Sequence, residues 1–218
     1  MSIVLHGAPA SPFVRKVRVA LIEKNVPYEL VPAIPFPPAN ETPEFRRISP
    51  LGKIPALTDG DFAISDSSVI CAWLERKHPN PPLYPSDANE YARALWFEEH
   101  ADSRLVEAIG PMFFQRFVRK LLFQQEPDEA IVRKALTEAV PPAFDYLEGQ
   151  LDGVDWLAGG RFTIADIATA SMLQQLRHTG ESIDAARWPH LAAYAERVLS
   201  RPSFKSCIAD EMAGLPKR

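Results

Sequence analysis

A serine near the start of the 218-residue chain occupies a position where its hydroxyl can stabilise an anion. Ser11 comes directly before Pro12, the order expected when a serine caps a helix and a proline takes its first turn. The free N–H groups and the dipole of a helix N-terminus favour negative charge. Ser11 is therefore a candidate for stabilising a thiolate or another small anion. The same pattern also fits a serine that does no more than cap the helix.

The neighbouring elements predict how Ser11 is held. Ile3–Leu5 is a short apolar run of the kind found in buried strands, and Gly7 breaks it. Apolar residues at helical spacing then predict a helix from Pro12 to about Lys24, and Tyr28–Val31 predicts a second strand. Two strands joined by one helix over so few residues are expected to be parallel. Ser11 would lie in the tight loop between the first strand and the first helix.

The rest of the first half predicts two more helices and a hairpin. Five prolines between Pro32 and Pro43 predict a long surface loop without regular structure, and Glu44–Ile48 has room for one or two helical turns. Asp59-Gly60 between short apolar runs predicts the turn of a β-hairpin. Residues 65–68 are polar and predict the cap of a helix that ends at His78. The first 78 residues are thus expected to follow the order β-α-β-α-β-β-α.

The second half of the chain is predicted to be entirely helical. Four prolines within residues 79–85 predict a linker, after which Ser86 or Asp87 caps a long helix that Gly110-Pro111 should kink or break. Thr163 and Asp166 have the spacing of a helix capping box, so Asp166 is expected to be structural. The predicted organisation is an α/β domain over residues 1–78, a linker over 79–86 and an all-α domain over 87–218.

Composition excludes several classes of partner. With 46% hydrophobic residues the chain can bury a substantial core, while a net charge of -4 gives no electrostatic case for nucleic acid. No apolar run is long enough to cross a bilayer, and the N-terminus does not resemble a secretory signal, so a cytoplasmic protein without a membrane partner is expected. Cys71 and Cys207 have no neighbours at ligand spacing, and neither a disulfide framework nor a metal site is predicted.

The order of elements resembles the thioredoxin-like N-terminal domain of cytosolic glutathione S-transferases. Three features carry the resemblance: the Ser11-Pro12 turn, the Lys53-Ile54-Pro55 segment before the third strand, and the Asp66-Ser67 pair at the start of the third helix. Ser-Pro-Phe at the turn is similar to the Cys-Pro-Phe turn of omega-like members, with serine in place of cysteine. The Thr163–Asp166 capping motif is similar to that of the family's helical C-terminal domain, so the resemblance extends along nearly the whole chain.

The resemblance implies a site for the tripeptide glutathione. A cis Ile54–Pro55 bond would turn the backbone of Ile54 toward the tripeptide, which could then pair like an added strand. Asp66 would meet the γ-glutamyl ammonium, Ser67 and its helix N-terminus the γ-glutamyl carboxylate, and Lys53 the glycyl carboxylate. Simpler roles remain open, because Asp66 and Ser67 also suit a helix cap and Lys53 a solvated loop. The implied glutathione-binding residues are Ser11, Phe13, Lys53, Ile54, Pro55, Asp66 and Ser67.

The chemistry implied for Ser11 is thiolate stabilisation. A free thiol with a pKa near 8.5 is only a few per cent ionised at neutral pH. One hydrogen bond to the charged sulfur is worth roughly 1.5–3 kcal/mol, or about one to two pKa units, so no metal, acid or base is required. In some serine-type classes the active serine lies two residues before the proline, where this chain has Ala10. With no tyrosine or cysteine near the turn, a cysteine-type thiol transferase is disfavoured.

The function implied by the resemblance is that of a detoxification enzyme, a glutathione transferase that takes glutathione as co-substrate, needs no metal and joins its thiolate to a small apolar electrophile. In the family, helices after the linker line the electrophile pocket, so the candidates are Met112, Phe113 and Phe117, although core packing is the simpler role for each. The resemblance also implies a homodimer, in which Asp102 could reach the partner subunit's glutathione or remain a solvated helix charge.

Two other classes of function stay open. Transferase-like domains also serve as non-catalytic interaction or regulatory proteins, and retention of Lys53, Pro55, Asp66 and Ser67 argues against a scaffold that has no tripeptide site. A specialised glutathione-dependent peroxidase, dehalogenase or isomerase would carry the same N-terminal pattern. Binding to immobilised glutathione separates the scaffold from the enzymes.

Overall fold

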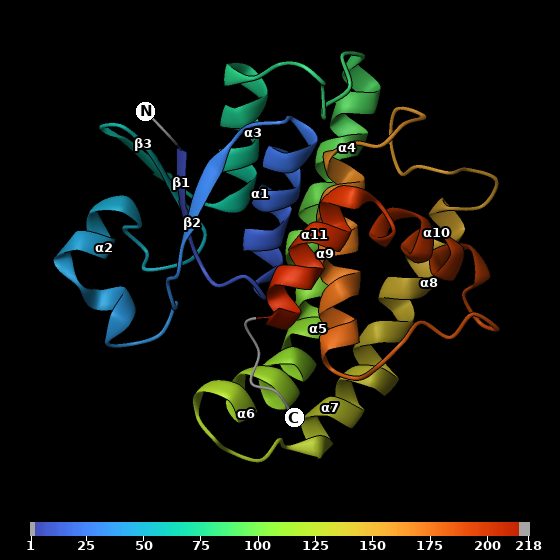
Figure 1. Cartoon of the computed structure of the whole chain (residues 1–218). Coiled ribbons are helices and arrows are strands. Elements are labelled where there is room, and N and C mark those ends of the chain that lie inside the picture. Colours follow the sequence, from blue (N-terminus) through green and yellow to red (C-terminus); the bar gives the residue numbers. More distant parts are fainter. Residues whose placement is uncertain (1–2, 214–218) are drawn as a thin grey trace. The chain divides into compact units, whose positions relative to one another are not determined.

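The computed structural model describes residues 3–213, which form two compact units. The first unit runs to Leu83 and also contains the C-terminal helix α11 (Pro202–Ala213); the second unit is Tyr84–Ser200. In Figure 1 the first unit holds the strands and the second holds helices alone. The predicted fold class, a thioredoxin-like α/β domain followed by helices, is confirmed. The sequence had assigned residues 202–213 to the helical domain, whereas α11 groups with the first unit.

A four-stranded mixed sheet forms the centre of the first unit. Its strands are β1 (Ile3–His6), β2 (Tyr28–Val31), β3 (Ala56–Asp59) and β4 (Phe62–Ser65), in the order β2-β1-β3-β4. The parallel pairing of β1 with β2 confirms the prediction, and β3 lies antiparallel to both β1 and β4. The strand β4 is therefore an edge of the sheet.

The hairpin between β3 and β4 turns one residue later than predicted. Asp59 pairs with Phe62, so the two-residue loop is Gly60-Asp61 and not Asp59-Gly60. Gly60 has φ +63°, the positive backbone angle that tight hairpin loops require at their first position. The composition of the turn was therefore predictable, but the glycine occupies the first loop position and Asp59 ends the strand.

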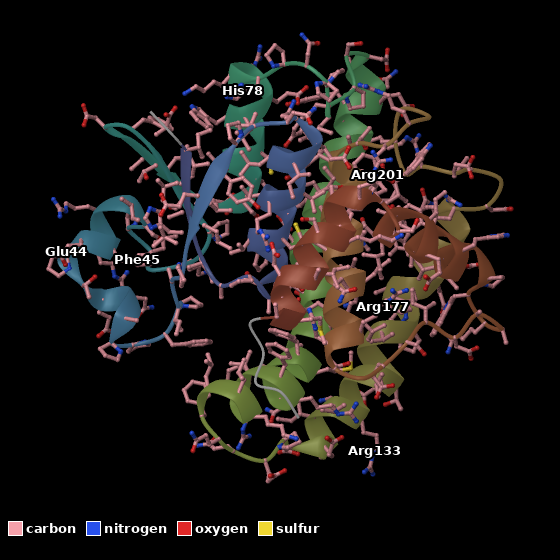
Figure 2. All side chains as sticks on the ribbon, viewed as in Figure 1. Glu44, Phe45, His78, Arg133, Arg177 and Arg201 are labelled. Atoms are coloured by element: carbon pink, nitrogen blue, oxygen red, sulfur yellow. The ribbon has the colours of Figure 1, made fainter. Side chains whose placement is uncertain are left out.

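Helices cover both faces of this sheet. In Figure 1 the strands lie between α2 (Pro43–Ile48) on one side and α1 (Pro12–Glu23) with α3 (Ser67–Lys77) on the other. The helix α2 is anchored in the hydrophobic core by Phe45, which is buried, whereas its neighbour Glu44 is exposed; Figure 2 labels both residues. The proline-rich stretch before α2, predicted to lack regular structure, contains one short 3₁₀ turn at Ala39–Glu41.

The second unit is built from helices that include three π-helical turns. Its α-helices are α4 (Ala88–His100), α5 (Val106–Phe113), α6 (Arg119–Leu122), α7 (Glu129–Lys134), α8 (Val140–Gln150), α9 (Ile164–His178) and α10 (Pro189–Leu199). The sequence predicted a kink or a break at Gly110-Pro111, and the break is wrong because α5 continues through Pro111. The π-helical turns Ala101–Leu105 and Phe114–Val118 lie on either side of α5 instead.

The helix α9 is the core of the second unit and begins at the predicted capping box. Every residue from Ile164 to Leu176 is buried. The Asp166 carboxylate accepts hydrogen bonds from the Thr163 backbone N–H at 2.8 Å, the Leu157 N–H at 3.2 Å and the Tyr194 hydroxyl at 3.0 Å. Burial nevertheless raises the pKa of Asp166 to about 6. Asp166 is thus structural, as predicted.

Candidate active site

The strand register brings three predicted site segments to one end of the sheet. His6 at the end of β1 pairs with Ala56 at the start of β3, and Ala56 pairs with Ser65 at the end of β4. The loop to Ser11 begins directly after His6. Pro55 directly precedes Ala56, and Asp66 directly follows Ser65. Burial lowers the pKa of His6 and so favours its neutral form.

Ser11 is the N-cap of α1, with Pro12 in the first helical position as predicted. Its half-buried Oγ accepts a long hydrogen bond of 3.5 Å from the Val14 backbone N–H. The loop before it is tight because Gly7 lies against Val14, whose Cγ2 would be 2.4 Å from a Cβ at that position. A hydroxyl can accept and donate at once. Capping therefore leaves the Ser11 proton available for an anion, and the two roles proposed for this serine are compatible.

The segment Lys53-Ile54-Pro55 is held by a serine that sequence reasoning did not identify. Ser49, fully buried, accepts from the Lys53 N–H at 3.0 Å and donates to the Lys53 carbonyl at 2.7 Å. The Ile54–Pro55 peptide bond is cis, and both residues are buried while the Lys53 side chain is exposed. A serine four residues before a lysine is too common a pattern to have revealed this arrangement.

Asp66 is the N-cap of α3 and Ser67 its first residue. The Oδ1 atom of Asp66 accepts from the Ser68 N–H at 3.0 Å and from the Val69 N–H at 3.1 Å. The cap role considered for Asp66 is therefore real, yet its side chain is exposed, so its second carboxylate oxygen can meet a ligand as well. Ser67 is buried at the helix N-terminus, where anions are favoured.

A buried lysine near this helix end was also missed from the sequence. Lys16, on the second turn of α1, is only 1% exposed and donates its Nζ to Ser68 Oγ at 2.9 Å. It carries a positive charge to the first turn of α3, one residue from Ser67. The apolar spacing predicted this helix but did not show that Val14–Leu21 is buried throughout and includes three cations. No local pattern reveals which cations of a helix are buried.

The predicted electrophile-pocket residues belong to the second unit. Met112 is fully buried, while Phe113 and Phe117 are half-buried and stack with their ring centroids 4.7 Å apart. The His178 ring lies 5.2 Å from the Phe117 ring. Beside them, Arg116 pairs with Glu129 at 2.7 Å. The two phenylalanines are thus better placed to contact a ligand than Met112.

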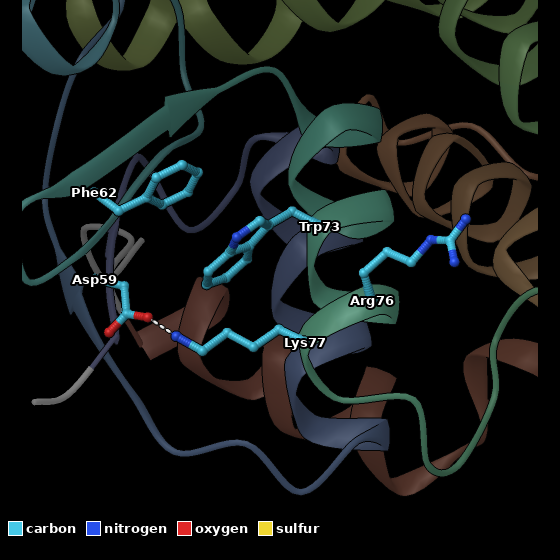
Figure 3. A pocket seen from close by; sticks show the side chains of 5 residues that line it. All are labelled: Asp59, Phe62, Trp73, Arg76 and Lys77. Atoms are coloured by element: carbon cyan, nitrogen blue, oxygen red, sulfur yellow. Dashed lines mark hydrogen bonds and ion pairs between the residues drawn. The ribbon is translucent and has the colours of Figure 1, made fainter.

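A separate cavity of about 490 Å³ lies at the opposite end of the β3–β4 hairpin. Figure 3 shows Phe62 from β4 and Trp73 from α3 facing each other, with ring centroids 5.3 Å apart. Lys77 lies over the Trp73 ring and pairs with Asp59, whereas Arg76 points away from these rings. Because Asp59 and Phe62 flank the hairpin turn, this cavity is distinct from the end of the sheet that holds Pro55 and Asp66.

The other chemical groups of the described residues do not form a second reactive centre. Cys71 and Cys207 are buried and are not joined in a disulfide, and burial raises the pKa of Cys207 to about 11. Within residues 3–213 there is no cluster of three or more potential metal ligands. No helix in that same range is both long enough and apolar enough to cross a membrane.

Comparison with known proteins shows which family this chain belongs to. The sequence model described as glutathione S-transferase, N-terminal domain, matches residues 5–82, and the one described as glutathione S-transferase, C-terminal domain, matches residues 106–202. Glutathione S-transferase 3 of Zea mays is 34% identical over 209 residues, which cover 94% of this chain and 92% of that protein. The chain belongs to the glutathione S-transferase family. The predicted family and enzyme class are thereby confirmed.

Two further relatives bear on the function. FtsZ-localized protein A of Caulobacter vibrioides is 30% identical over 222 residues, which cover 97% of this chain and 92% of that protein. The solved structure of a glutathione S-transferase-I bound with lactoylglutathione is 26% identical, covers 96% of this chain and 99% of that chain, and has a TM-score of 0.86. The fold therefore occurs both in a protein solved with a glutathione derivative and in one named for its association with another protein.

Proposed function

We propose that this glutathione transferase activates the glutathione thiol through Ser11, which acts as the catalytic residue. The observation that carries the proposal is the geometry of the Ser11 hydroxyl. Its oxygen accepts from the Val14 N–H at the start of α1, and no acceptor for its proton occurs among residues 3–213. The hydroxyl can therefore donate to a thiolate that also lies near the helix N-terminus. Ala10, the alternative position, has no group that could do this.

The rest of the tripeptide would extend along the end of the sheet. The γ-glutamyl carboxylate would bind Ser67 and the N-terminus of α3, and its ammonium would bind the exposed carboxylate of Asp66. The backbone of Ile54 would pair with the tripeptide, Lys53 would bind the glycyl carboxylate, and Phe13 and Pro55 would complete the walls. The support is that all three segments adjoin the paired residues His6, Ala56 and Ser65.

The proposed reaction needs no group beyond the co-substrate and its site. The glutathione thiol loses its proton to solvent, and the Ser11 hydroxyl stabilises the resulting thiolate. The sulfur then attacks the electrophilic carbon of a small apolar substrate, a C–S bond forms, and the leaving group departs with its electron pair. Phe113 and Phe117 would contact the apolar substrate, with Met112 behind them in the core. Detoxification in the cytoplasm is the role we propose for such a reaction.

A homodimer is the proposed assembly. In the first unit the edge strand β4 and the helix α3 expose Phe62 and Val69, which are 42% and 47% accessible. In the second unit Tyr91 and Leu95 are exposed one turn apart on α4. An open sheet edge can pair with another chain, and exposed apolar patches often mark an interaction site. A second copy of this chain is the partner we propose for these exposed residues, and Asp102 could then reach the partner subunit's glutathione.

The experiment that tests the function is a pH titration of thiolate absorbance for glutathione bound to the wild type and to Ser11→Ala. The bound thiol should have a pKa below that of free glutathione in the wild type, and the pKa should rise by about one to two units without the hydroxyl. An unchanged pKa would remove Ser11 from the mechanism.

The non-catalytic alternative has one specific support, the similarity to FtsZ-localized protein A. Chromatography on immobilised glutathione decides between the two, because the enzyme should be retained and eluted by free glutathione. Passage without retention would favour the interaction protein. Peroxidase, dehalogenase and isomerase activities share the thiolate step, and assays with a hydroperoxide, a haloalkane and a cis-enone separate them.

A further inference from the structure

The C-terminal helix α11 is bound to α1 along its length. The two helices lie side by side in Figure 1 and run antiparallel, since residue numbers fall along α11 as they rise along α1. Two ion pairs join them, Arg15 with Glu211 and Arg18 with Asp210, and a third joins Glu23 to Arg201, the residue directly before α11. The helix that carries Ser11 at its start is therefore held by a segment almost 200 residues away in sequence.

The pair nearest Ser11 differs from the other two in its burial. Arg15 Nε donates to Glu211 Oε1 at 2.6 Å and Arg15 Nη2 donates to Oε2 at 2.7 Å, and both side chains are completely inaccessible. Asp210, by contrast, is 59% exposed. A bidentate pair of this kind fixes the direction of the guanidinium as well as its position. Arg15 and Glu211 thus form a rigid link, while the other pairs are partly solvated.

This rigid link lies beside the first turn of α1. The Arg15 backbone N–H donates to the Ser11 carbonyl at 2.9 Å, which makes Arg15 the residue one turn above Ser11. Side chains on a helix slant toward its N-terminus, so the Arg15 side chain covers the turn that contains Ser11 and Pro12. Pro12 has no N–H and cannot help to fix that turn through a backbone hydrogen bond.

We infer that Glu211 is a positioning residue for the thiolate site. It holds Arg15, Arg15 holds the first turn of α1, and that turn aims the Ser11 hydroxyl and the free N–H groups at the sulfur. The inference rests on the proposed function of Ser11 and adds the C-terminal helix to the parts that define the site.

The sign of the pKa change separates positioning from simple electrostatics. Removing the Glu211 carboxylate makes the surroundings of the site more positive, which by itself would stabilise a thiolate and lower the pKa of the bound thiol. Loosening the first turn of α1 weakens the hydrogen bond from Ser11 and raises that pKa. The inference therefore predicts the direction opposite to the one expected from the lost charge.

The test compares Glu211→Gln with Glu23→Gln in the full chain. Both variants break one of the three ion pairs, and both should lower the melting temperature, but Glu23 lies at the far end of α1. The pKa of bound glutathione should rise by about half a unit or more in Glu211→Gln and stay at the wild-type value in Glu23→Gln. Amide hydrogen exchange at Val14 and Arg15 should accelerate in the first variant alone.

Each outcome decides a separate question. A wild-type protein that does not lower the pKa of the bound thiol would overturn the function of Ser11 and this inference with it. The other outcome concerns Glu211 alone. If the wild type lowers the pKa of the bound thiol and Glu211→Gln leaves that pKa unchanged or lowers it further, the role of Glu211 is overturned. Where Glu211→Gln does not fold, Glu211→Asp keeps the charge but shortens the side chain by one methylene. That variant should also raise the thiol pKa, and a wild-type value there would contradict the inference.

Discussion

Lys16 on α1 donates its Nζ to Ser68 Oγ on α3 at 2.9 Å, so a buried cation connects the two helices whose N-termini define the proposed site. Ser68 follows Ser67, where the γ-glutamyl carboxylate of glutathione is proposed to bind. A buried positive charge at this point adds to the attraction that a helix N-terminus exerts on an anion. Lys16 therefore links the proposed thiolate end of the site to its proposed carboxylate end.

Replacement of this charge should weaken glutathione binding. Lys16→Met keeps most of the buried aliphatic length, and we expect the dissociation constant for glutathione to rise roughly fivefold, equivalent to about 1 kcal/mol. Isothermal titration calorimetry measures the change. Lys77→Met removes a lysine from the far end of α3 and is the matched control, which should bind glutathione normally. Equal affinities in the wild type and Lys16→Met would show that Lys16 serves packing alone.

The protein's own thiols are expected to be unreactive in the folded state. Cys71 and Cys207 are both buried, and the thiolate form of Cys207 is further disfavoured because burial raises its pKa to about 11. A disulfide reagent such as dithiobis-nitrobenzoate should therefore label neither cysteine at pH 7.5, and should label both after denaturation. Rapid labelling of either cysteine in the native protein would contradict the prediction and would reopen chemistry by a protein thiol.

The buried Asp166 should give the second unit a pH-dependent stability. Its folded-state pKa of about 6 lies above the ordinary value of 3.8, so the native state binds more protons than the unfolded state between these two values. The stabilisation is complete below pH 3.8 and is lost as the pH rises through 6. When the pH is lowered from 7 to 4.5, protonation of Asp166 should increase the free energy of unfolding by about 2 kcal/mol.

Asp166→Asn tests this, because asparagine does not titrate in that range. Urea unfolding at both pH values should show that the wild type gains about 2 kcal/mol more than the variant on acidification. The comparison uses the change with pH, so the loss of the capping box in the variant cancels. Parallel stability curves for the two proteins would show that the Asp166 carboxylate does not titrate abnormally.

The features that sequence reasoning predicted correctly are those encoded over a few residues. Ser11 before Pro12 and Thr163 before Asp166 are complete capping signals, and both helices begin where these signals place them. The hairpin was recognised from Asp59-Gly60, but its register was one residue out because a glycine with positive φ can occupy more than one turn position. Local chemistry thus identifies an element better than it fixes its boundary.

The features that were missed depend on partners far apart in the chain. Arg15 and Glu211 are separated by 196 positions, and neither has a local pattern that marks it as buried. The same holds for Lys16, whose acceptor Ser68 lies on another helix. The motifs of the proposed tripeptide site can be recognised in the sequence, whereas the groups that hold those motifs in place became visible only when the helices were packed together.

The last prediction concerns the exposed face formed by β4 and α3. Trp73→Glu would place a charge beside Phe62 in the face that a second copy is proposed to cover, where its desolvation would oppose association. We expect analytical ultracentrifugation to give the mass of two chains for the wild type and of one chain for the variant. Val154→Glu adds the same charge at an exposed apolar residue of the second unit and should leave the dimer intact. A Trp73→Glu protein that sediments as the wild type does would show that this face is not a dimer interface.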